Sequence, residues 1–343
     1  MKAAFIDSHG SVDVLKYMDI KDPICTSGKV KINIKAASIN HLDIWVREGI
    51  PGIKIPLPMI LGSDGAGVVV EVGENINSVN VGDRVVIQPG TYSPNCKKVK
   101  EHLENFSSTY GILGETESGV QCDYVVLDPN NIHPMCKDLT FEEASSMQLV
   151  FMTSYQMLIK RAYLKPSETI LIYGGTSGIG SAAIQIAKDI GAKVITTVGS
   201  DSKFNHAFEN GADYVFNHSK KNWIKEIKGI LKKDMIDVVF EHVGLETWET
   251  SMRLLARGGR IVTCGATTGH SVNIDLRHLF SKQQSIIGST MADIDTFKKV
   301  QLKIQQKIYT PFVDRIYPLS DIKEAHRRIE KRKNLGKVVL SLV

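Results

Sequence analysis

The hydrophobic and polar positions follow different patterns in different parts of the chain. In the first third, short apolar runs alternate with polar residues and end at Gly, Asp-Arg or Pro-Gly, as in residues 29–38, 66–73 and 83–90. An alternation with a period of two predicts β-strands, and the residues that end the runs predict tight turns. The pattern therefore indicates a small barrel of short strands.

A second pattern begins near residue 141. Residues 141–168 are predicted to form an apolar helix with Glu142 and Glu143 in its first turn and a stop at Pro166. Apolar strands and helices then alternate as far as residue 266. Such an alternation is typical of a parallel, doubly wound sheet with a core of its own.

The last part of the chain returns to a mixed pattern after about Met291. It ends in residues 336–343, which predict a strand that rejoins the first domain. The expected fold class is α/β. The predicted domain segments are residues 1–130, 131–290 and 291–343.

Composition and charge narrow the class of protein. The 343 residues are 43% hydrophobic and 23% charged, which describes a globular chain large enough for two cores. The basic stretches are interleaved with apolar residues at helical spacing, so the net charge of +5 predicts solvated helix faces rather than a nucleic-acid site. No apolar run approaches the ~18 residues that a membrane span needs. Five scattered cysteines without a C-x-x-C pair favour a reducing compartment, so we expect a cytoplasmic protein with a small-molecule substrate and neither a nucleic-acid nor a membrane partner.

A glycine-rich turn is the sharpest local signal. A predicted strand runs directly into residues 174–180, Gly-Gly-Thr-Ser-Gly-Ile-Gly, and then into a helix of small residues. A dinucleotide binds in this context, because glycines let the backbone approach a pyrophosphate and the helix N-terminus presents N–H groups to it. Ser177 replaces the middle glycine of the usual G-x-G-x-x-G pattern, and an ordinary turn is the alternative interpretation. The predicted cofactor-binding residues here are Gly175, Thr176, Ser177, Gly178, Ile179 and Gly180.

The residues after the second strand of this domain bear on the choice between NAD and NADP. A carboxylate at this point accepts from the ribose 2′-hydroxyl of NAD and repels the 2′-phosphate of NADP. Here the strand ends without a carboxylate, and Ser200 and Lys203 offer a hydroxyl and an ammonium that suit a phosphate. We therefore predict NADPH as the cofactor, with Ser200, Lys203 and His218 among its binding residues. Asp201 is the opposing feature, although Ser200 and Asp201 are also residue types that cap a helix.

Several segments, taken in order, resemble the medium-chain dehydrogenase/reductase superfamily over essentially the whole chain. They are NHLDIWVREG, LGSDGAGVVVEVG, VGDRVV, GGTSGIGSAAIQIAKDIGAKVI, ENGADYVFN, GGRIVTCGATTG and GSTM. The resemblance implies a GroES-like catalytic domain from segments 1–130 and 291–343, and a Rossmann NADP-binding domain over 131–290. We also expect a homodimer or homotetramer, in which the segment HSVNIDLRHLF either pairs two Rossmann sheets or lies inside the molecule.

The resemblance also bears on metal binding. Zinc-dependent alcohol dehydrogenases of this superfamily hold a catalytic zinc through a cysteine, a histidine and a third cysteine or carboxylate. By motif, the corresponding residues here are Asn40, Ser63 and Leu149, none of which is a zinc ligand. No zinc is therefore expected, and the alternative is a rebuilt site that uses the nearby His41 and Asp64.

A second metal site of the family, the structural zinc lobe, also has a counterpart in this sequence. The lobe carries four cysteines, and its register here falls on Ser93, Cys96, Val99 and Ser107. Cys96 and His102 offer two donors, which do not make a closed tetrahedral site. The segment resembles a zinc lobe that has kept its length and lost its metal.

The expected chemistry follows from these losses. Zinc-free members of the superfamily share the N-x-x-D pattern of residues 40–43 and are NADPH-dependent quinone or enoyl reductases. Hydride addition to an activated double bond or a quinone needs less electrostatic help than oxidation of a simple alcohol. The predicted function is zinc-independent, NADPH-dependent reduction of an enone, an enoyl thioester or a quinone. The alternatives are a divergent zinc-type alcohol dehydrogenase and a non-enzymatic NADPH-binding protein.

The resemblance implies roles for individual residues near the nicotinamide. His41 is the first candidate for proton donor, because its pKa lies near neutrality, and Tyr92 is the second; solvent is the alternative. Asn40 completes the predicted catalytic residues and lines the ribose side. Asp43 and Arg47 are interpreted as structural residues that tie down the loop by hydrogen bonds.

The same resemblance implies further cofactor contacts. Lys337 is expected near the cofactor phosphates, with a solvated lysine as the alternative. The other residues are expected to hold the carboxamide or line the ribose, with a plain turn or packing role as the alternative for each. They are Thr153, Val243, Gly244, Cys264, Gly265, Ala266, Ser289 and Thr290.

Overall fold

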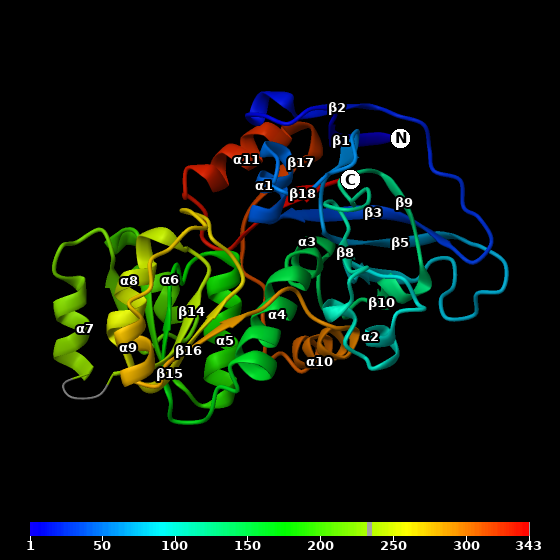
Figure 1. Cartoon of the computed structure of the whole chain (residues 1–343). Helices are drawn as coiled ribbons and strands as arrows, with labels where there is room; N and C mark the ends of the chain where they lie inside the picture. Colours follow the sequence, from blue (N-terminus) through cyan, green and yellow to red (C-terminus); the bar gives the residue numbers. More distant parts are fainter. Residues whose placement is uncertain (232–234, 343) are drawn as a thin grey trace. The chain divides into compact units, whose positions relative to one another are not determined.

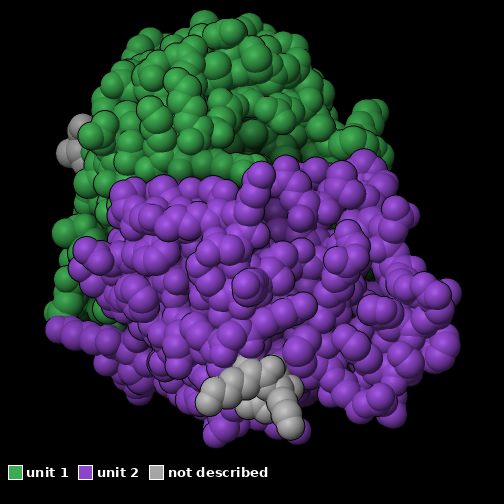
Figure 2. All heavy atoms as spheres, turned by 90° about the vertical axis from the view of Figure 1, so that its left-hand side faces the viewer, with its two compact units in different colours: residues 1–149, 293–305, 310–343 green, residues 150–292, 306–309 purple. Residues whose placement is uncertain are grey.

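The computed structural model describes residues 1–231 and 235–342, which divide into two compact units. Unit 1 consists of Met1–Leu149, Asp293–Gln305 and Thr310–Val343, and unit 2 consists of Val150–Ala292 and Gln306–Tyr309 (Figure 2). The chain thus leaves unit 1 at residue 150, returns at residue 293, and leaves it again only for residues 306–309.

Unit 1 is built on a seven-stranded sheet with the order β10-β6-β5-β3-β18-β17, and β9 also pairs with β3 (Figure 1). Its strands are β3 (Val30–Ile39), β5 (Asp64–Val72), β6 (Arg84–Ile87), β9 (Tyr124–Leu127), β10 (Ile132–Pro134), β17 (Val313–Pro318) and β18 (Lys337–Ser341). A three-stranded sheet and a two-stranded sheet accompany it. They consist of β1 (Lys2–Ile6), β2 (Lys16–Asp19) and β4 (Met59–Ile60), and of β7 (Gly90–Thr91) and β8 (Gly111–Ile112). The β-rich character predicted for this part of the chain is confirmed.

Strand β3 explains how the apolar pattern builds this unit. Its first half alternates, and Val30, Ile32 and Ile34 are fully buried in the core of the sheet. Its second half, residues 36–39, is buried at every position, so a polar side chain there has to find its partners inside the protein. On its other edge β3 pairs with β18, antiparallel, with Ile39 opposite Val338. The predicted return of the C-terminal strand to the first domain is therefore confirmed.

The helices of unit 1 are short and lie between its strands. They are α1 (His41–Glu48), α2 (Lys97–Lys100), α3 (Phe141–Ser145), α10 (Ile294–Gln305) and α11 (Ile322–Glu330), with 3₁₀ turns at Val12–Val14, Glu104–Phe106, Pro129–Asn131 and Leu319–Asp321. No helix of the described residues is long and apolar enough to cross a membrane.

Unit 2 contains a six-stranded sheet in which every pairing is parallel. Its order is β13-β12-β11-β14-β15-β16, the 3-2-1-4-5-6 order of a Rossmann fold. The strands are β11 (Thr169–Ile172), β12 (Lys193–Val198), β13 (Tyr214–Asn217), β14 (Ile236–Glu241), β15 (Leu255–Thr263) and β16 (Ser285–Gly288). The predicted doubly wound sheet is confirmed.

Helices connect these strands (Figure 1). They are α5 (Gly178–Ile190), α6 (Phe204–Glu209), α7 (Trp223–Leu231), α8 (Leu245–Leu254) and α9 (Leu276–Ser281), with a 3₁₀ turn at Asp201–Lys203. The segment that contains α9 lies at the surface of the chain, where Leu276 and Phe280 are exposed. The interpretation that this segment lies inside the molecule is therefore wrong, while the homo-oligomer stays a prediction.

The single helix predicted over residues 141–168 is wrong. Helix α3 ends at Ser145, α4 (Gln148–Tyr155) begins three residues later, and Gln156–Arg161 continue as a π-helix. The hydroxyls of Ser145 and Ser146 lie 3.1 and 2.7 Å from the carbonyls of Glu142 and Glu143. Serine hydroxyls that bond to preceding carbonyls compete with the helical ladder, which accounts for the break.

Candidate active site

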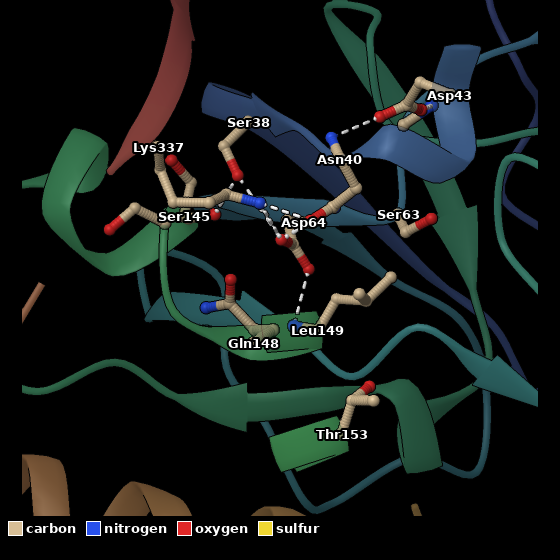
Figure 3. Close-up of polar contacts among 12 residues, drawn as sticks. Ser38, Asn40, Asp43, Ser63, Asp64, Ser145, Gln148, Leu149, Thr153 and Lys337 are labelled. Atoms are coloured by element: carbon tan, nitrogen blue, oxygen red, sulfur yellow. Dashed lines mark hydrogen bonds and ion pairs between the residues drawn. The ribbon is translucent and has the colours of Figure 1, made fainter. Parts of the chain in front are cut away.

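A buried polar cluster lies in unit 1, where β3, β5 and β18 meet. Lys337, the first residue of β18, has its Nζ 3.0 Å from Oδ2 of Asp64, the first residue of β5. The same Nζ donates to Oδ1 of Asn40, and Nδ2 of Asn40 donates to Oδ2 of Asp64 over 2.9 Å. Lys337, Asn40 and Asp64 are only 4%, 6% and 0% exposed. We call this closed triangle of hydrogen bonds the Lys337–Asn40–Asp64 cluster (Figure 3).

Further donors complete the environment of the Asp64 carboxylate. Oδ1 accepts from the backbone N–H of Leu149 over 2.9 Å, and Oδ2 lies 3.3 Å from Oγ of Ser38. Oγ of Ser38 also lies 2.8 Å from the carbonyl of Ser145. The carboxylate thus has an ammonium and several neutral donors around it, which is what a buried ion needs in order to stay in the interior.

Strand register brings these distant residues together. In the β3–β5 pair Ser38 lies opposite Asp64, and in the β18–β3 pair Val338 lies opposite Ile39. Asn40 and Lys337 each adjoin one of these paired positions. Antiparallel neighbours are about 5 Å apart, so residues almost 300 positions apart in the chain come within hydrogen-bond distance.

The cluster answers a question that the sequence left open, namely whether Lys337 is a solvated surface lysine. Lys337 is buried and paired with Asp64, so the solvated-lysine interpretation is wrong. Both polar atoms of the Asn40 amide are hydrogen-bonded within the cluster. The predicted cofactor contact of Lys337 and the predicted catalytic role of Asn40 stay predictions.

Asp43 and Arg47 are structural residues, as the sequence predicted. The carboxylate of Asp43 accepts from the backbone N–H groups of Asn40 and Gly62, over 2.7 and 2.8 Å. Burial raises the pKa of Asp43 to about 7, and the two backbone donors and the charge of Lys337 oppose that rise. Arg47, 1% exposed, pairs with Glu330 of α11 over 2.7 Å.

The residues present do not fit a catalytic zinc. Asn40 and Leu149 lack ligand atoms suited to zinc, and Oγ of Ser63 donates to the carbonyl of Leu113. Where a metal would need Asp64, that carboxylate already faces an ammonium. In residues 1–231 and 235–342, no three His, Cys, Asp or Glu side chains come together as potential metal ligands.

The Ser93–Ser107 lobe forms a short helical loop. Cys96 precedes α2, and the hydroxyl of Ser107 together with backbone N–H groups holds the pKa of the Cys96 thiol below its ordinary value. Ser107 and Thr109 have their hydroxyl oxygens 2.8 Å apart, and Thr109 in turn accepts from the N–H of Ser93. Hydroxyl hydrogen bonds thus join the two ends of the lobe.

The two candidate proton donors occupy different surroundings. His41 opens α1, is exposed, and meets the ring of Trp45 edge-on with the centroids 5.1 Å apart. Tyr92 follows β7, and burial, together with the charge of Glu104, raises its pKa to about 12. A phenol with so high a pKa does not match the task of a proton donor at neutral pH. Both roles stay predictions.

In unit 2 the glycine-rich turn joins β11 to α5. Gly174 has φ +61°, and a Cβ on Gly180 would lie 2.2 Å from the carbonyl oxygen of Gly174, so the helix approaches the turn too closely for any other residue. Ser177 has φ −77°, which is why a serine is accepted there, and its side chain caps α5 by accepting from the N–H of Gly180. The structure thus brings Gly175, Thr176, Ser177, Gly178, Ile179 and Gly180 together at one helix N-terminus.

The predicted residues at the end of β12 also come together. Oγ of Ser200 lies 2.8 Å from Oγ of Ser202, and Lys203 ends the 3₁₀ turn. The ring of His218, which follows β13, lies beside Gly199 and 3.2 Å from Oγ1 of Thr197. Asp201 caps nothing through its side chain, because its carboxylate accepts from Asn217 and Lys220 instead.

Glu241, at the end of β14, is a residue that the sequence analysis missed. Its carboxylate is 0% exposed and accepts from the N–H groups of Val243 and Gly244, over 2.7 and 3.1 Å. The hydroxyls of Thr247 and Ser251 supply the remaining hydrogen bonds, at 2.9–3.0 Å. A charged residue that ends an apolar strand and precedes a glycine turn is the signal that could have revealed it.

The loops that start at Glu241 and at Cys264 are joined by backbone hydrogen bonds. Thr268 donates to the carbonyl of Val243, and Leu245 donates to the carbonyl of Gly269. A Cβ on Gly244, which has φ +92°, would lie 2.4 Å from that Gly269 oxygen. The structure therefore places Val243, Gly244, Cys264, Gly265 and Ala266 in one rigid pair of loops.

The remaining predicted contacts also lie in unit 2. Ser289 follows β16, its N–H donates to Thr263, and its buried hydroxyl has no hydrogen-bond partner among the described residues. Thr290 comes next in the chain, and Oγ1 of Thr153 lies 3.7 Å from Sδ of Met291. An unpartnered buried hydroxyl is a group that a ligand can satisfy.

Two family models match different parts of the chain. Residues 26–137 match the family model of the alcohol dehydrogenase GroES-like domain, and residues 178–306 match that of the zinc-binding dehydrogenases. Human quinone oxidoreductase is 29% identical over 350 residues, which span 100% of this chain and 98% of that protein. The crotonyl-CoA carboxylase/reductase of Cereibacter sphaeroides is 28% identical over 96% of this chain and 84% of that protein.

Solved structures agree with this assignment. A crystal structure of an NAD-dependent alcohol dehydrogenase is 37% identical, with a TM-score of 0.96 and 100% of both chains covered. A thermostable alcohol dehydrogenase from Pyrobaculum aerophilum is 30% identical, with a TM-score of 0.89 and 99% of both chains covered. The predicted α/β fold, with a GroES-like domain and a Rossmann-type domain, is confirmed. The chain belongs to the medium-chain dehydrogenase/reductase superfamily of oxidoreductases, in its quinone oxidoreductase-like branch.

Proposed function

We propose that this protein is an NADPH-dependent reductase that transfers hydride to an activated double bond or a quinone without a catalytic zinc. The observation that carries the proposal is the Lys337–Asn40–Asp64 cluster. The Lys337 ammonium and the Asn40 amide are hydrogen-bonded to the Asp64 carboxylate, which a rebuilt metal site would need. Asn40, Ser63 and Leu149 lie at the positions of the family's zinc ligands. Reduction of an enone, an enoyl thioester or a quinone needs a positioned hydride donor and a proton source, which such a site can provide.

The residues of unit 2 fit a nicotinamide dinucleotide. The N-terminus of α5 behind the glycine turn suits the pyrophosphate, because the first N–H groups of a helix have no partner inside the helix. The loops at residues 243–244 and 264–266 are held together by backbone hydrogen bonds, and the unpartnered hydroxyl of Ser289 suits the carboxamide. In this proposal the cofactor supplies the hydride, and the protein holds its ring in place.

His41 is the proposed proton donor. Hydride addition to the β-carbon of an enone or enoyl thioester leaves an enolate, which takes one proton to complete the reduction. The exposed imidazole of His41 at the start of α1 can deliver that proton and regain another from solvent. Asn40 and Lys337 are already bonded to Asp64, so we assign them to hold the local structure instead.

A second candidate function is alcohol dehydrogenation with NAD. It is favoured by one observation, the 37% identity to an NAD-dependent alcohol dehydrogenase over the full length of both chains. In that case a metal would have to bind without the family's ligands.

The test is the initial rate of NADPH oxidation by protein treated with a strong chelator. Its acceptors are ortho-quinones, 2-enals and short enoyl-CoA thioesters. We expect turnover with one of these classes and no change when zinc is added back. Substitution of His41 by Gln should lower kcat about 100-fold if the imidazole is the donor. Activity that appears only with zinc and an alcohol would select the second candidate, and NADPH binding without turnover would select a binding protein.

A further inference from the structure

The carboxylate of Asp201 is held by residues from the neighbouring strand end. Oδ1 accepts from Nδ2 of Asn217 over 2.8 Å, and Oδ2 accepts from Nζ of Lys220 over 2.7 Å. Asn217 is the last residue of β13, and Lys220 follows three residues later. The side chains of Asp201 and Lys220 are 58% and 50% exposed, so this is an ion pair at the surface.

The same two loops are tied at further points. Oγ of Ser219 donates to the carbonyl of Gly199 over 2.9 Å, and the N–H of His218 donates to the carbonyl of Val198 over 3.0 Å. The N–H of Ser219 donates to Oδ1 of Asn217, which fixes the amide so that its Nδ2 faces Asp201. Since β12 and β13 are parallel neighbours, both loops lie at the carboxyl edge of the sheet. Open parallel sheets bind their ligands at this edge.

Charge at this position decides between the two nicotinamide cofactors. A free carboxylate accepts from the 2′-hydroxyl of NAD and repels the 2′-phosphate of NADP. Hydrogen bonds from Lys220 and then from Asn217 hold the pKa of Asp201 below its ordinary value, so the group is ionised at neutral pH. The effect of Asp201 on a cofactor therefore depends on whether its charge is already balanced.

We propose that Lys220 is a cofactor-selectivity residue, which pairs with Asp201 and so allows a 2′-phosphate to bind beside Ser200 and His218. This inference rests on the proposed function, because it takes the cofactor to lie at the end of β12. It also removes the objection that Asp201 raised in the sequence, since that carboxylate is directed at Asn217 and Lys220. No motif in the sequence marks Lys220, which becomes visible only through the pairing of β12 with β13.

The experiment measures the dissociation constants of NADPH and NADH by quenching of intrinsic fluorescence, in wild type and in Lys220→Gln. The substitution leaves the Asp201 carboxylate without its ammonium. We expect NADPH to bind about 3- to 10-fold more weakly, and NADH to bind equally or up to about 3-fold more tightly, as for a surface ion pair of ordinary strength. Raising the salt concentration should shrink the difference, because exposed charges are screened.

Lys221→Gln is the matched control. Lys221 is the next residue, is exposed, and forms no ion pair with any residue that the structure describes. The Lys221→Gln variant removes the same charge from the same loop. It therefore measures how the net charge of the loop alone affects the dissociation constant of a cofactor with a phosphate. We expect it to change both dissociation constants by less than about 2-fold.

The double variant Lys220→Gln/Asp201→Asn separates neutralisation from direct contact. If Lys220 acts by balancing Asp201, NADPH affinity returns to near the wild-type value in the double variant. An equal loss with Asp201 or Asn at position 201 would overturn the inference, because Lys220 would then contact the phosphate itself. An unchanged selectivity in Lys220→Gln, or a wild-type protein that binds only NADH, would also overturn it. A wild type that binds neither cofactor would refute the proposed function and this inference with it.

Discussion

Unit 1 and unit 2 each contain a fully buried carboxylate at one end of a strand, and they stabilise it differently. Asp64 in unit 1 faces the ammonium of Lys337 as well as neutral donors. Glu241 in unit 2 meets neutral donors only, namely backbone N–H groups and the hydroxyls of Thr247 and Ser251. The Asp64 carboxylate therefore depends on a residue 273 positions away, whereas every partner of the Glu241 carboxylate lies within ten residues. One site is built by the tertiary fold and the other by a single turn.

Asp43 provides a third case within unit 1. It is almost as buried as the other two, but it accepts from two backbone N–H groups and forms no ion pair with any described residue. Its pKa rises to about 7 because burial outweighs those donors. The three carboxylates thus share their burial but differ in the number and charge of the donors around them.

The largest effect is expected from Lys337→Met. This variant leaves the Asp64 carboxylate in the interior without its counter-ion, and breaking a buried pair in this way costs about 3–5 kcal/mol of unfolding free energy. Urea unfolding followed by circular dichroism measures the loss. Lys331→Met, which removes an exposed lysine near the same strand, is the control and should change stability by less than about 0.5 kcal/mol.

The double variant Lys337→Met/Asp64→Asn tests the reason for that loss. With no charge left at these two positions, part of the stability should return. A double variant that is less stable than Lys337→Met by the full effect of a second buried substitution would contradict the pairing argument. The methylene packing of the lysine would then explain the loss instead.

The same comparison shows how much could be predicted from the sequence. The parallel sheet, the glycine turn and the C-terminal strand were predictable, because periodicity and glycine spacing are local signals. The positions Asn40, Ser63 and Leu149 marked the missing zinc ligands, but the pairing of Lys337 with Asn40 and Asp64 was not predictable from them. Lys337 reaches Asp64 through the register of β18 on β3, and no short pattern encodes that pairing. Glu241 was missed for another reason, since one carboxylate at a strand end looks like any other turn residue.

The second effect is a dependence of stability on pH that comes from Asp43. Its folded pKa, about 7, is raised above the unfolded value of 3.8. Between about pH 4 and pH 7 the folded state therefore holds a proton that the unfolded state has released, so stability falls as the pH rises through this window. A pKa raised from 3.8 to about 7 corresponds to at most about 4 kcal/mol of unfolding free energy.

Asp43→Asn isolates this contribution. Because Asn does not titrate, the difference in unfolding free energy between wild type and variant should shift in favour of the variant as the pH rises from 4 to 7. Taking the difference cancels the contributions of other titrating groups to the pH dependence. One such group is His326, whose pKa is lowered to about 3 by burial and by Arg47. A difference that stays constant with pH would show that Asp43 remains ionised across the range.

The smallest effect is expected from Glu241→Gln. The amide keeps one oxygen to accept from the N–H groups of Val243 and Gly244, and its new N–H₂ can donate to the hydroxyl oxygens of Thr247 and Ser251, which rotate. We expect a loss of about 1–2 kcal/mol in unfolding free energy, well below that of Lys337→Met. The exposed Glu249→Gln, in the helix α8 that follows, is the control.

Cofactor binding distinguishes a positioning role of Glu241 from a purely structural one. If its carboxylate fixes the Val243–Gly244 turn for the nicotinamide, Glu241→Gln should raise the KM for NADPH several-fold at temperatures where the variant is fully folded. A purely structural role predicts an unchanged KM with the same loss of stability. A destabilisation as large as that of Lys337→Met would contradict the comparison between the two units. The turn around Glu241 would then depend on its carboxylate as strongly as Asp64 depends on its counter-ion.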